Sequence, residues 1–321
     1  MKIAFVGKGG SGKTTLAALL CRYLAARGRT VLALDADINQ NLAEALGATG
    51  EQAAALPRLG DHLVQIKEYL RGDNPRIASA AAMVKTTPPG RGSRLLRVVE
   101  DNPVYAGCVR RVGGVRLAVT GGFAEADLGV SCYHSKVGAV ELLLNHLLDA
   151  PGEYVVVDMT AGADAFASGL FTRFDRTFVV CEPTLRSVGV YRQYQQYAGG
   201  HGVAASVLGN KVADAGDEAF LRAHAGDDLL GCLSVSAHVR AAERGLPRPV
   251  GELEPANLAV LEAVHAEVDG TAQDWDRFWA QAVDFHRRNA LAWGNARTGT
   301  DLTEQIDPGF VMSPALADAV G

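Results

Sequence analysis

Residues 7–14 constrain the fold more strongly than any other part of the sequence. They read Gly-Lys-Gly-Gly-Ser-Gly-Lys-Thr and match the pattern in which four residues separate two glycines and Lys-Thr follows. An apolar run over residues 1–6 predicts a buried strand before this segment, and leucines at helical spacing over 15–26 predict a helix after it. A strand, a glycine loop and a helix in this order bring backbone N–H groups and a helix N-terminus around a phosphate group. The sequence therefore predicts a P-loop.

The P-loop pattern also indicates which residues contact a nucleoside triphosphate and its Mg²⁺. We expect Lys13 to reach the β- and γ-phosphates and the Thr14 hydroxyl to bind Mg²⁺. Neighbouring residues are expected to surround the phosphates: Gly9, Gly10, Ser11, Gly12 and Thr15. A chance glycine-rich turn is the alternative, and the agreement of motif, strand and helix argues against it.

Composition and charge fit a soluble enzyme. The chain has 321 residues, 48% of them hydrophobic, and its formal net charge of −5 argues against a basic nucleic-acid-binding body. No apolar run reaches the roughly 20 residues of a membrane helix. Because the chain enters a strand at once, we expect no signal peptide. The cysteines are odd in number and widely spaced, without a Cys-x-x-Cys pair, so a reducing, cytoplasmic location is expected.

Predicted strands alternate with predicted helices along the chain after the P-loop. Apolar strands are expected at 30–34, 115–119, 154–157, 177–181 and 203–208, and helices at 63–70 and 137–148. This alternation predicts a three-layer α/β fold, in which helices cover both faces of a mostly parallel sheet. Ligands of such sheets bind beyond the carboxyl ends of the strands. Polar residues fall at these ends: Asp35, Asp37, Asp158, Glu182 and Asn210.

Two of the strand-end carboxylates have an expected part in hydrolysis. Asp158 occupies the position of a Walker B acid and is expected to hold Mg²⁺ through water, with a capping aspartate as the alternative. Asp37 is placed to orient an attacking water, whereas Asp35 lies nearer the strand and is expected to be structural.

The late strand end at Asn210 and Lys211 suits recognition of the nucleotide base, and we assign Glu182 to the same nucleotide site. Guanine-specific proteins commonly use Asn-Lys-x-Asp, whereas this sequence has Ala213 at the fourth position. That difference favours adenine, and hence ATP. A polar strand exit without a ligand is the alternative.

We expect a P-loop domain over residues 1–250, with an insertion at 48–114, and a helical C-terminal extension over 251–321. All three tryptophans lie in the extension, and Trp275, Phe278, Trp279, Ala282 and Phe285 recur at helical spacing. This stripe is expected to pack on the body or on a sister subunit, and a docking surface for a client protein is the alternative. The residues from Thr298 onward are expected to be partly disordered.

Taken together, the loop 8–14 and the segments Asp35-Ala36-Asp37, 158–162 and Asn210-Lys211 resemble the deviant-Walker-A ATPases. This group includes MinD, ParA, the nitrogenase iron protein and the nickel-insertion ATPases of carbon monoxide dehydrogenase. The resemblance covers about residues 1–250. It implies that Lys8 reaches across a two-fold dimer to the phosphates bound by the partner, so that ATP binding and dimerisation are one event. A solvated loop lysine is the alternative.

Within this group the sequence is most similar to the nickel-insertion type, on residues 35–47, 114–122 and 158–162. That type carries Cys-x-Cys before a Leu-rich helix, where this chain has Cys132-Tyr133-His134. A two-fold axis would bring two copies of Cys132 and His134 together as a Cys₂His₂ set, which suits Zn²⁺ or Ni²⁺. A core cysteine and a capping or solvated histidine are the alternative. Residues 161–170 contain no cysteine, which disfavours the cluster of a nitrogenase iron protein.

The motifs predict an ATPase, and the resemblance implies an ATP-switched homodimer whose output is metal delivery to, or maturation of, a metalloenzyme. A ParA- or MinD-like positioning switch acting on a protein, DNA or membrane partner is one alternative. An ATP-gated regulator that acts only through its C-terminal extension is another.

Overall fold

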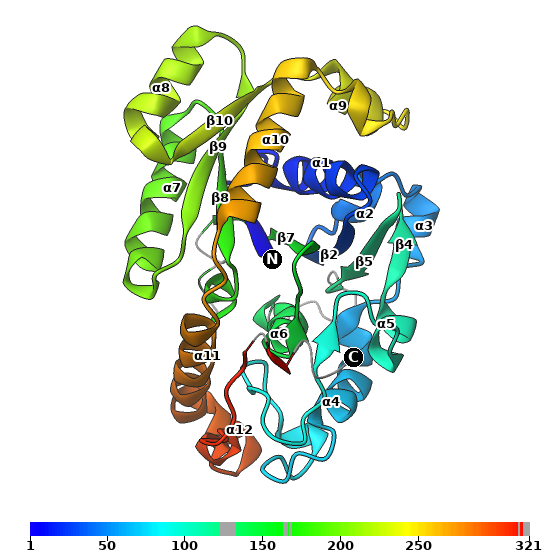
Figure 1. The fold of residues 1–321 in the computed structure, drawn as a ribbon, viewed down its shortest axis with the longest axis vertical. Helices are drawn as coiled ribbons and strands as arrows, with labels where there is room; N and C mark the ends of the chain where they lie inside the picture. Colours follow the sequence, from blue (N-terminus) through cyan, green and yellow to red (C-terminus); the bar gives the residue numbers. More distant parts are fainter. Residues whose placement is uncertain (122–132, 163–165, 167–168, 314, 317–321) are drawn as a thin grey trace.

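An eight-stranded sheet forms the centre of the computed structural model (Figure 1). The structure describes residues 1–121, 133–162, 166, 169–313 and 315–316, with the backbone alone at 133–136. The strands lie in the order β10-β9-β8-β1-β7-β2-β5-β4, and neighbours pair in parallel except β4, which is antiparallel to β5. Their bounds are β1 Lys2–Gly7, β2 Thr30–Ala36, β4 Arg110–Val112, β5 Val115–Val119, β7 Glu153–Met159, β8 Arg176–Cys181, β9 Ala205–Val212 and β10 Leu229–Ser234.

Helices cover both faces of the sheet, which confirms the three expected layers. Successive side chains of a strand point to opposite faces, so Ile3 and Phe5 of β1 enter one core, whereas Ala4 and Val6 enter the other. The first core is closed by α1 (Lys13–Ala26), α2 (Leu42–Ala45) and α10 (Pro255–Gly270). The second is closed by α4 (Leu63–Arg71), α5 (Pro103–Cys108), α6 (Tyr133–Asn145), α7 (Leu185–Ala198) and α8 (Ala215–Ala225).

Two predicted elements end three or more residues away from their expected ends. The helix expected at 137–148 ends at Asn145, because Leu147 and Leu148 form the short strand β6 and pair with β3 (Leu96–Arg97). The strand expected at 203–208 is β9, which continues to Val212 because its end still pairs with β10. Asn210 and Lys211 therefore lie within the last residues of a strand. The strands β4 and β10 were not predicted.

The aromatic stripe packs on the body of the molecule, as expected. It lies on α11 (Trp275–Asn289), where Trp275 and Phe278 are buried against Leu148 and Met312. The guanidinium of Arg173, which is fully buried, lies over the ring of Phe278 at 4.7 Å. The alternative of an open aromatic docking surface is therefore wrong for Trp275 and Phe278.

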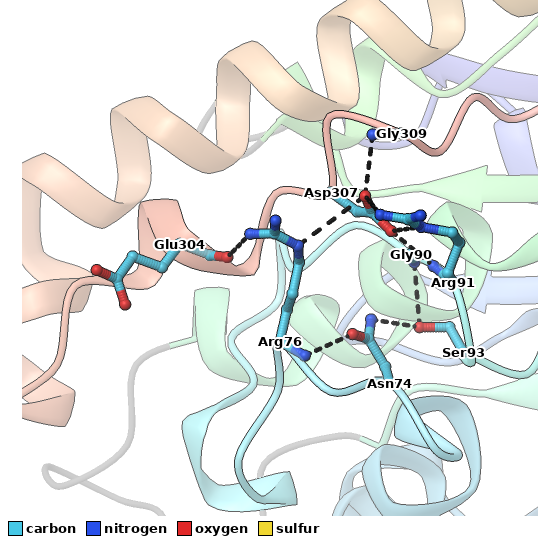
Figure 2. A network of polar contacts seen from close by, with 8 residues as sticks. All are labelled: Asn74, Arg76, Gly90, Arg91, Ser93, Glu304, Asp307 and Gly309. Carbon is cyan, nitrogen blue, oxygen red and sulfur yellow. Dashed lines mark hydrogen bonds and ion pairs between the residues drawn. The ribbon is translucent and has the colours of Figure 1, made fainter.

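The expectation of disorder after Thr298 is wrong for residues 301–313. This segment contains the 3₁₀ helix η10 (Leu302–Gln305) and packs against residues 74–93. Figure 2 shows its main anchor, Asp307, which accepts two hydrogen bonds from the Arg91 guanidinium, at 2.8 and 2.9 Å, and lies 3.9 Å from Arg76. Gln305 adds contacts to Thr87 and to the Ala82 carbonyl. Specific partners distant in sequence thus order this segment.

No helix in the part of the chain described above is long and apolar enough to cross a membrane.

Candidate nucleotide site

The predicted P-loop connects β1 to α1 at the carboxyl edge of the sheet. Gly10 and Gly12 have φ of 79° and 97°, in the left-handed region that favours glycine. A Cβ at Gly12 would stand 2.1 Å from Nδ2 of Asn210, so position 12 has no room for a side chain. Because β1 lies between β7 and β8, the loop emerges between the ends of those strands, beside Asp158 and Glu182.

Thr14 and Asp158 meet at the first turn of α1. The Thr14 hydroxyl donates a hydrogen bond of 2.6 Å to Oδ2 of Asp158. The other carboxylate oxygen, Oδ1, is buried and has no hydrogen-bond partner among the described residues. A buried carboxylate oxygen without a donor, next to a threonine hydroxyl, is a donor set that fits Mg²⁺ and its waters. Burial, and then the nearby Asp35, raise the pKa of Asp158.

Asp35 and Asp37 have different surroundings, although only Ala36 separates them. Asp35 is fully buried and accepts hydrogen bonds from the backbone N–H groups of Asp37 and Leu42, at 3.1 and 3.0 Å. Burial raises its pKa to about 7. Asp35 thus fixes the loop between β2 and α2, as its expected structural role requires. Asp37 lines the cleft and accepts from the backbone and side-chain amides of Asn39, both at 3.0 Å.

The two lysines of the loop lie in different environments. Lys13 is 5% exposed, and its ammonium donates a long hydrogen bond of 3.4 Å to the Lys8 carbonyl. The Lys8 side chain is 35% exposed, and its Nζ lies 3.6 Å from Oε2 of Glu182 in the same chain. Lys13 is therefore directed along the loop, whereas Lys8 is directed toward the end of β8.

The end of β9 supports the loop from the side. The Asn210 amide donates a hydrogen bond of 2.7 Å to the Ser11 carbonyl. Lys211 has a φ of 59°, rare for a residue with a side chain, and its ammonium donates to the Gly10 carbonyl at 2.7 Å and to Glu182 at 2.8 Å. These residues, predicted to contact the base, contact the phosphate loop in this structure.

An open cleft of about 790 Å³ extends from the P-loop along α1, and Gly9, Thr15 and Asp37 are among the residues that line it. Its far wall is α9 (Ala237–Glu243), which the sequence analysis missed. A smaller cavity of about 210 Å³ lies between Gly12, Asn210 and the segment from Ser234 to Val239. The sequence does contain a signal for this part of the site. The apolar run 229–233 ends in Ser-Val-Ser, which is a polar strand end like those that carry the other site residues.

The predicted metal ligands Cys132 and His134 are not placed by the structure. Cys132 lies outside the described residues, and only the backbone of His134, in the first turn of α6, is described. Among the described side chains, no group of three or more His, Cys, Asp or Glu residues could hold a metal ion.

The three-layer fold has a P-loop that carries Lys8 and Lys13, a Thr14–Asp158 pair and a supporting lysine, Lys211, near the end of β9. These features define a P-loop nucleotide hydrolase. The profile of the CobQ/CobB/MinD/ParA nucleotide binding domain matches residues 3–248, and the chain belongs to this family. It is a nucleotide-binding ATPase, for which ATP and Mg²⁺ are the ligands.

Two curated relatives match most of the chain. It is 32% identical over 246 residues to the carbon monoxide dehydrogenase accessory protein CooC of Rhodospirillum rubrum, a match that covers 76% of this chain and 87% of the relative. It is 29% identical over 247 residues to an uncharacterized ATP-binding protein of Methanocaldococcus jannaschii, covering 76% and 88%.

Solved structures share the fold at lower identity. MinD of Pyrococcus horikoshii, complexed with Mg-ADP, has a TM-score of 0.55 at 17% identity and covers 84% of this chain and 96% of its own. A ParA family ATPase of Chlorobium tepidum has a TM-score of 0.56 at 14% identity, covering 83% and 98%. These similarities confirm the predicted fold class.

Proposed function

We propose that the protein is a dimerising ATPase switch that delivers metal to a metalloenzyme or matures one. The observation that carries this proposal is the 32% identity to a carbon monoxide dehydrogenase accessory protein, which extends over 246 residues. A ParA- or MinD-like positioning function is the second candidate, and metal content separates it from metal delivery.

Within one subunit, the chain's own groups would bind and orient the triphosphate. The backbone from Gly9 to Thr15 and the ammonium of Lys13 would hold the phosphates, and Thr14 and Asp158 would hold Mg²⁺ and its waters. When bound, Mg²⁺ neutralises charge on the phosphates. Asp37, which faces the cleft, would orient the attacking water. The buried Oδ1 of Asp158, which has no donor among the described residues, supports this assignment.

Between subunits, Lys8 would reach the partner's phosphates and make ATP binding and pairing one event. Its partly exposed side chain on the rim of the loop supports this role, since a buried lysine could not leave its own chain. Asn210, Lys211 and Glu182 would form the side of the site that contacts the nucleotide base. The small cavity beside Asn210 supports an adenine position there.

The proposed cargo is a transition-metal ion. Cys132 and His134 of two subunits would together bind Zn²⁺ or Ni²⁺, and this pair precedes α6 in the sequence. The client is expected to be a cytoplasmic metalloenzyme. We also propose that residues 1–250 are the ATPase domain, with its insertion at 48–114, and that 251–321 form an extension. The family match ends at residue 248, which supports this division, although α10 packs in the same core as α1.

Metal analysis of anaerobically purified protein tests the cargo. We expect half an equivalent of Zn or Ni per subunit that depends on ATP and is lost in Cys132→Ala. Buried Cys21→Ala is the matched control and should retain the metal. Absence of metal with every nucleotide would exclude metal delivery, and ATP-dependent binding to DNA or liposomes would then favour the positioning function.

Sedimentation analysis with a non-hydrolysable ATP analogue tests the dimer. Lys8→Ala should still bind nucleotide as a monomer but fail to pair. Unchanged pairing of Lys8→Ala would remove the trans-lysine role while leaving the ATPase assignment intact.

A further inference from the structure

Glu182 stands between two lysines at the carboxyl end of β8. Its Oε1 accepts a hydrogen bond of 2.8 Å from Lys211, and its Oε2 lies 3.6 Å from the ammonium of Lys8. The carboxylate is 18% exposed, whereas the Lys8 and Lys211 side chains are 35% and 51% exposed. Burial alone would raise the pKa of Glu182, but Lys211 and then Lys8 hold it below its usual value. Glu182 is therefore an anion that both lysines share.

The two lysines are held unequally. Lys211 has a second acceptor, the Gly10 carbonyl at 2.7 Å, and the left-handed backbone at Lys211 positions its side chain toward the loop. Among the described residues, the Lys8 ammonium has one ionic contact, the looser one of 3.6 Å with Glu182. If Lys8 leaves, Glu182 keeps Lys211 as its counterion, so the carboxylate is not left unpaired. Lys8 is thus the lysine that can be released.

We propose that Glu182 is a positioning residue that holds Lys8 on its own subunit and thereby sets the ATP concentration at which two subunits pair. This inference rests on the proposed trans role of Lys8. A lysine held by its own chain cannot contact the phosphates bound by a second copy, so pairing requires the exchange of Glu182 for a phosphate oxygen. The phosphates of a bound nucleotide carry more negative charge than one carboxylate, so the exchange is favoured when these phosphates are present. Glu182 in this way suppresses pairing of nucleotide-free subunits.

The size of the effect follows from the exposure of the pair. An ion pair as exposed as this one changes an equilibrium by up to about fivefold. Both subunits of a two-fold dimer must release their lysine, so the factor enters the dimerisation constant twice, giving up to about 25-fold. Because the pair is exposed, salt should weaken it and reduce the difference.

The test measures the ATP-analogue concentration at half-maximal dimer by sedimentation velocity, at fixed protein concentration and low salt. Glu182→Gln removes the charge but keeps the shape, and it should pair at a severalfold lower concentration than wild type. Lys211→Gln leaves Lys8 as the counterion of Glu182, so it should pair at a higher concentration. Opposite shifts distinguish this mechanism from a general disturbance of the loop, which would move both variants in the same direction. Glu218→Gln, which breaks an exposed pair with Arg222 on α8, is the matched control and should not differ from wild type.

The affinity for nucleotide is measured separately, by binding of fluorescent ADP to Lys8→Ala and to Lys8→Ala/Glu182→Gln. Any difference in ADP affinity between these two variants is used to correct the ATP-analogue concentrations at half-maximal dimer. An unchanged or higher midpoint for Glu182→Gln, with pairing still dependent on Lys8, overturns this inference alone. Pairing that is independent of Lys8 in the wild-type background overturns the proposed trans role and this inference with it.

Discussion

Asp35 and Asp158 occupy paired positions on the neighbouring parallel strands β2 and β7, and both carboxylates are fully buried. Asp35 accepts hydrogen bonds from backbone N–H groups of its own loop. Among the described residues, the only hydrogen bond to Asp158 comes from the Thr14 hydroxyl, to one of its two oxygens. Two buried carboxylates side by side disfavour ionisation of both, and the pKa of each is raised by burial. A cation beside Asp158 would relieve this repulsion. The pairing would therefore couple Mg²⁺ binding to the loop that carries Asp37.

Replacement of Asp158 should raise the Mg²⁺ requirement of the ATPase. Asp158→Asn keeps the shape of the side chain but removes the charge, and partners that act on a metal through water contribute about 10–100-fold in metal affinity. ATP hydrolysis measured against Mg²⁺ concentration should shift by about that factor. Asp101→Asn, an exposed carboxylate paired with Arg116, should not change the curve. Equal Mg²⁺ curves for Asp158→Asn and wild type would contradict the assignment.

A methyl group at Gly12 should abolish nucleotide binding. Both Gly12 and Gly28 have positive φ, so alanine at either position costs about 1–2 kcal/mol of unfolding free energy. A new Cβ at Gly12 would meet Nδ2 of Asn210, whereas a Cβ at Gly28 would meet no described residue within 4 Å apart from its chain neighbours. Gly12→Ala should therefore lose ADP binding by calorimetry, and Gly28→Ala should keep it. Tight binding by Gly12→Ala would show that Asn210 can move aside.

Stability should fall in mild acid because of His286. This side chain is fully buried, with its two ring nitrogens 3.2 Å from the Thr86 hydroxyl and 2.9 Å from the Leu302 carbonyl. Burial lowers its pKa from 6.5 to about 4. The unfolded chain then binds a proton that the folded chain does not, so stability is complete above pH 6.5 and is lost as the pH falls toward 4.

Chemical denaturation at several pH values tests this contribution. In His286→Gln the slope of unfolding free energy against pH between about 4 and 6.5 should be smaller by up to about 1.4 kcal/mol per pH unit. His146, also buried with its pKa lowered to about 4, supplies a second contribution of the same sign. An identical slope in His286→Gln would mean that the folded protein accepts the proton at this site.

Loss of the Asp307 carboxylate should free the C-terminal segment. Asp307→Asn removes the ionic contacts to Arg91 and Arg76 that Figure 2 shows, so residues 301–313 should be cleaved faster by chymotrypsin. Asp276→Asn, an exposed acid in the first turn of α11, is the control and should be cleaved at the wild-type rate. Mass spectrometry of the early fragments locates the cuts. Equal cleavage rates would show that the apolar contacts of Leu302 and Met312, with the hydrogen bonds of Gln305, suffice to hold the segment.

Sequence alone predicts the fold and the position of Asp158 well, because both depend on local patterns. The P-loop motif, the apolar strands and the acids that follow them are each visible within about ten residues. Strand ends of a parallel sheet meet at one edge, so the relation between Thr14 and Asp158 also follows. Asp37 lines the same cleft, although its role in hydrolysis stays a prediction.

Contacts between segments that lie far apart in the chain could not be predicted from local sequence patterns. The charges that order the C-terminal segment come from Asp307 and Arg91, 216 residues apart, and local composition there indicates only a polar tail. The sharing of Glu182 by Lys8 and Lys211 depends on the order of β1, β8 and β9 in the sheet. The wall made by α9 was missed because the helix is short and its strand, β10, is only partly buried.

The contact between residues 74–93 and 301–313 makes two segments that lie far apart in the chain depend on each other. Neither can be exchanged or deleted alone without exposing the other's apolar and charged partners to water. Evolution would therefore be expected to gain or lose both segments together. A relative that ends near residue 270 of this numbering should carry a shorter or differently charged counterpart of residues 74–93.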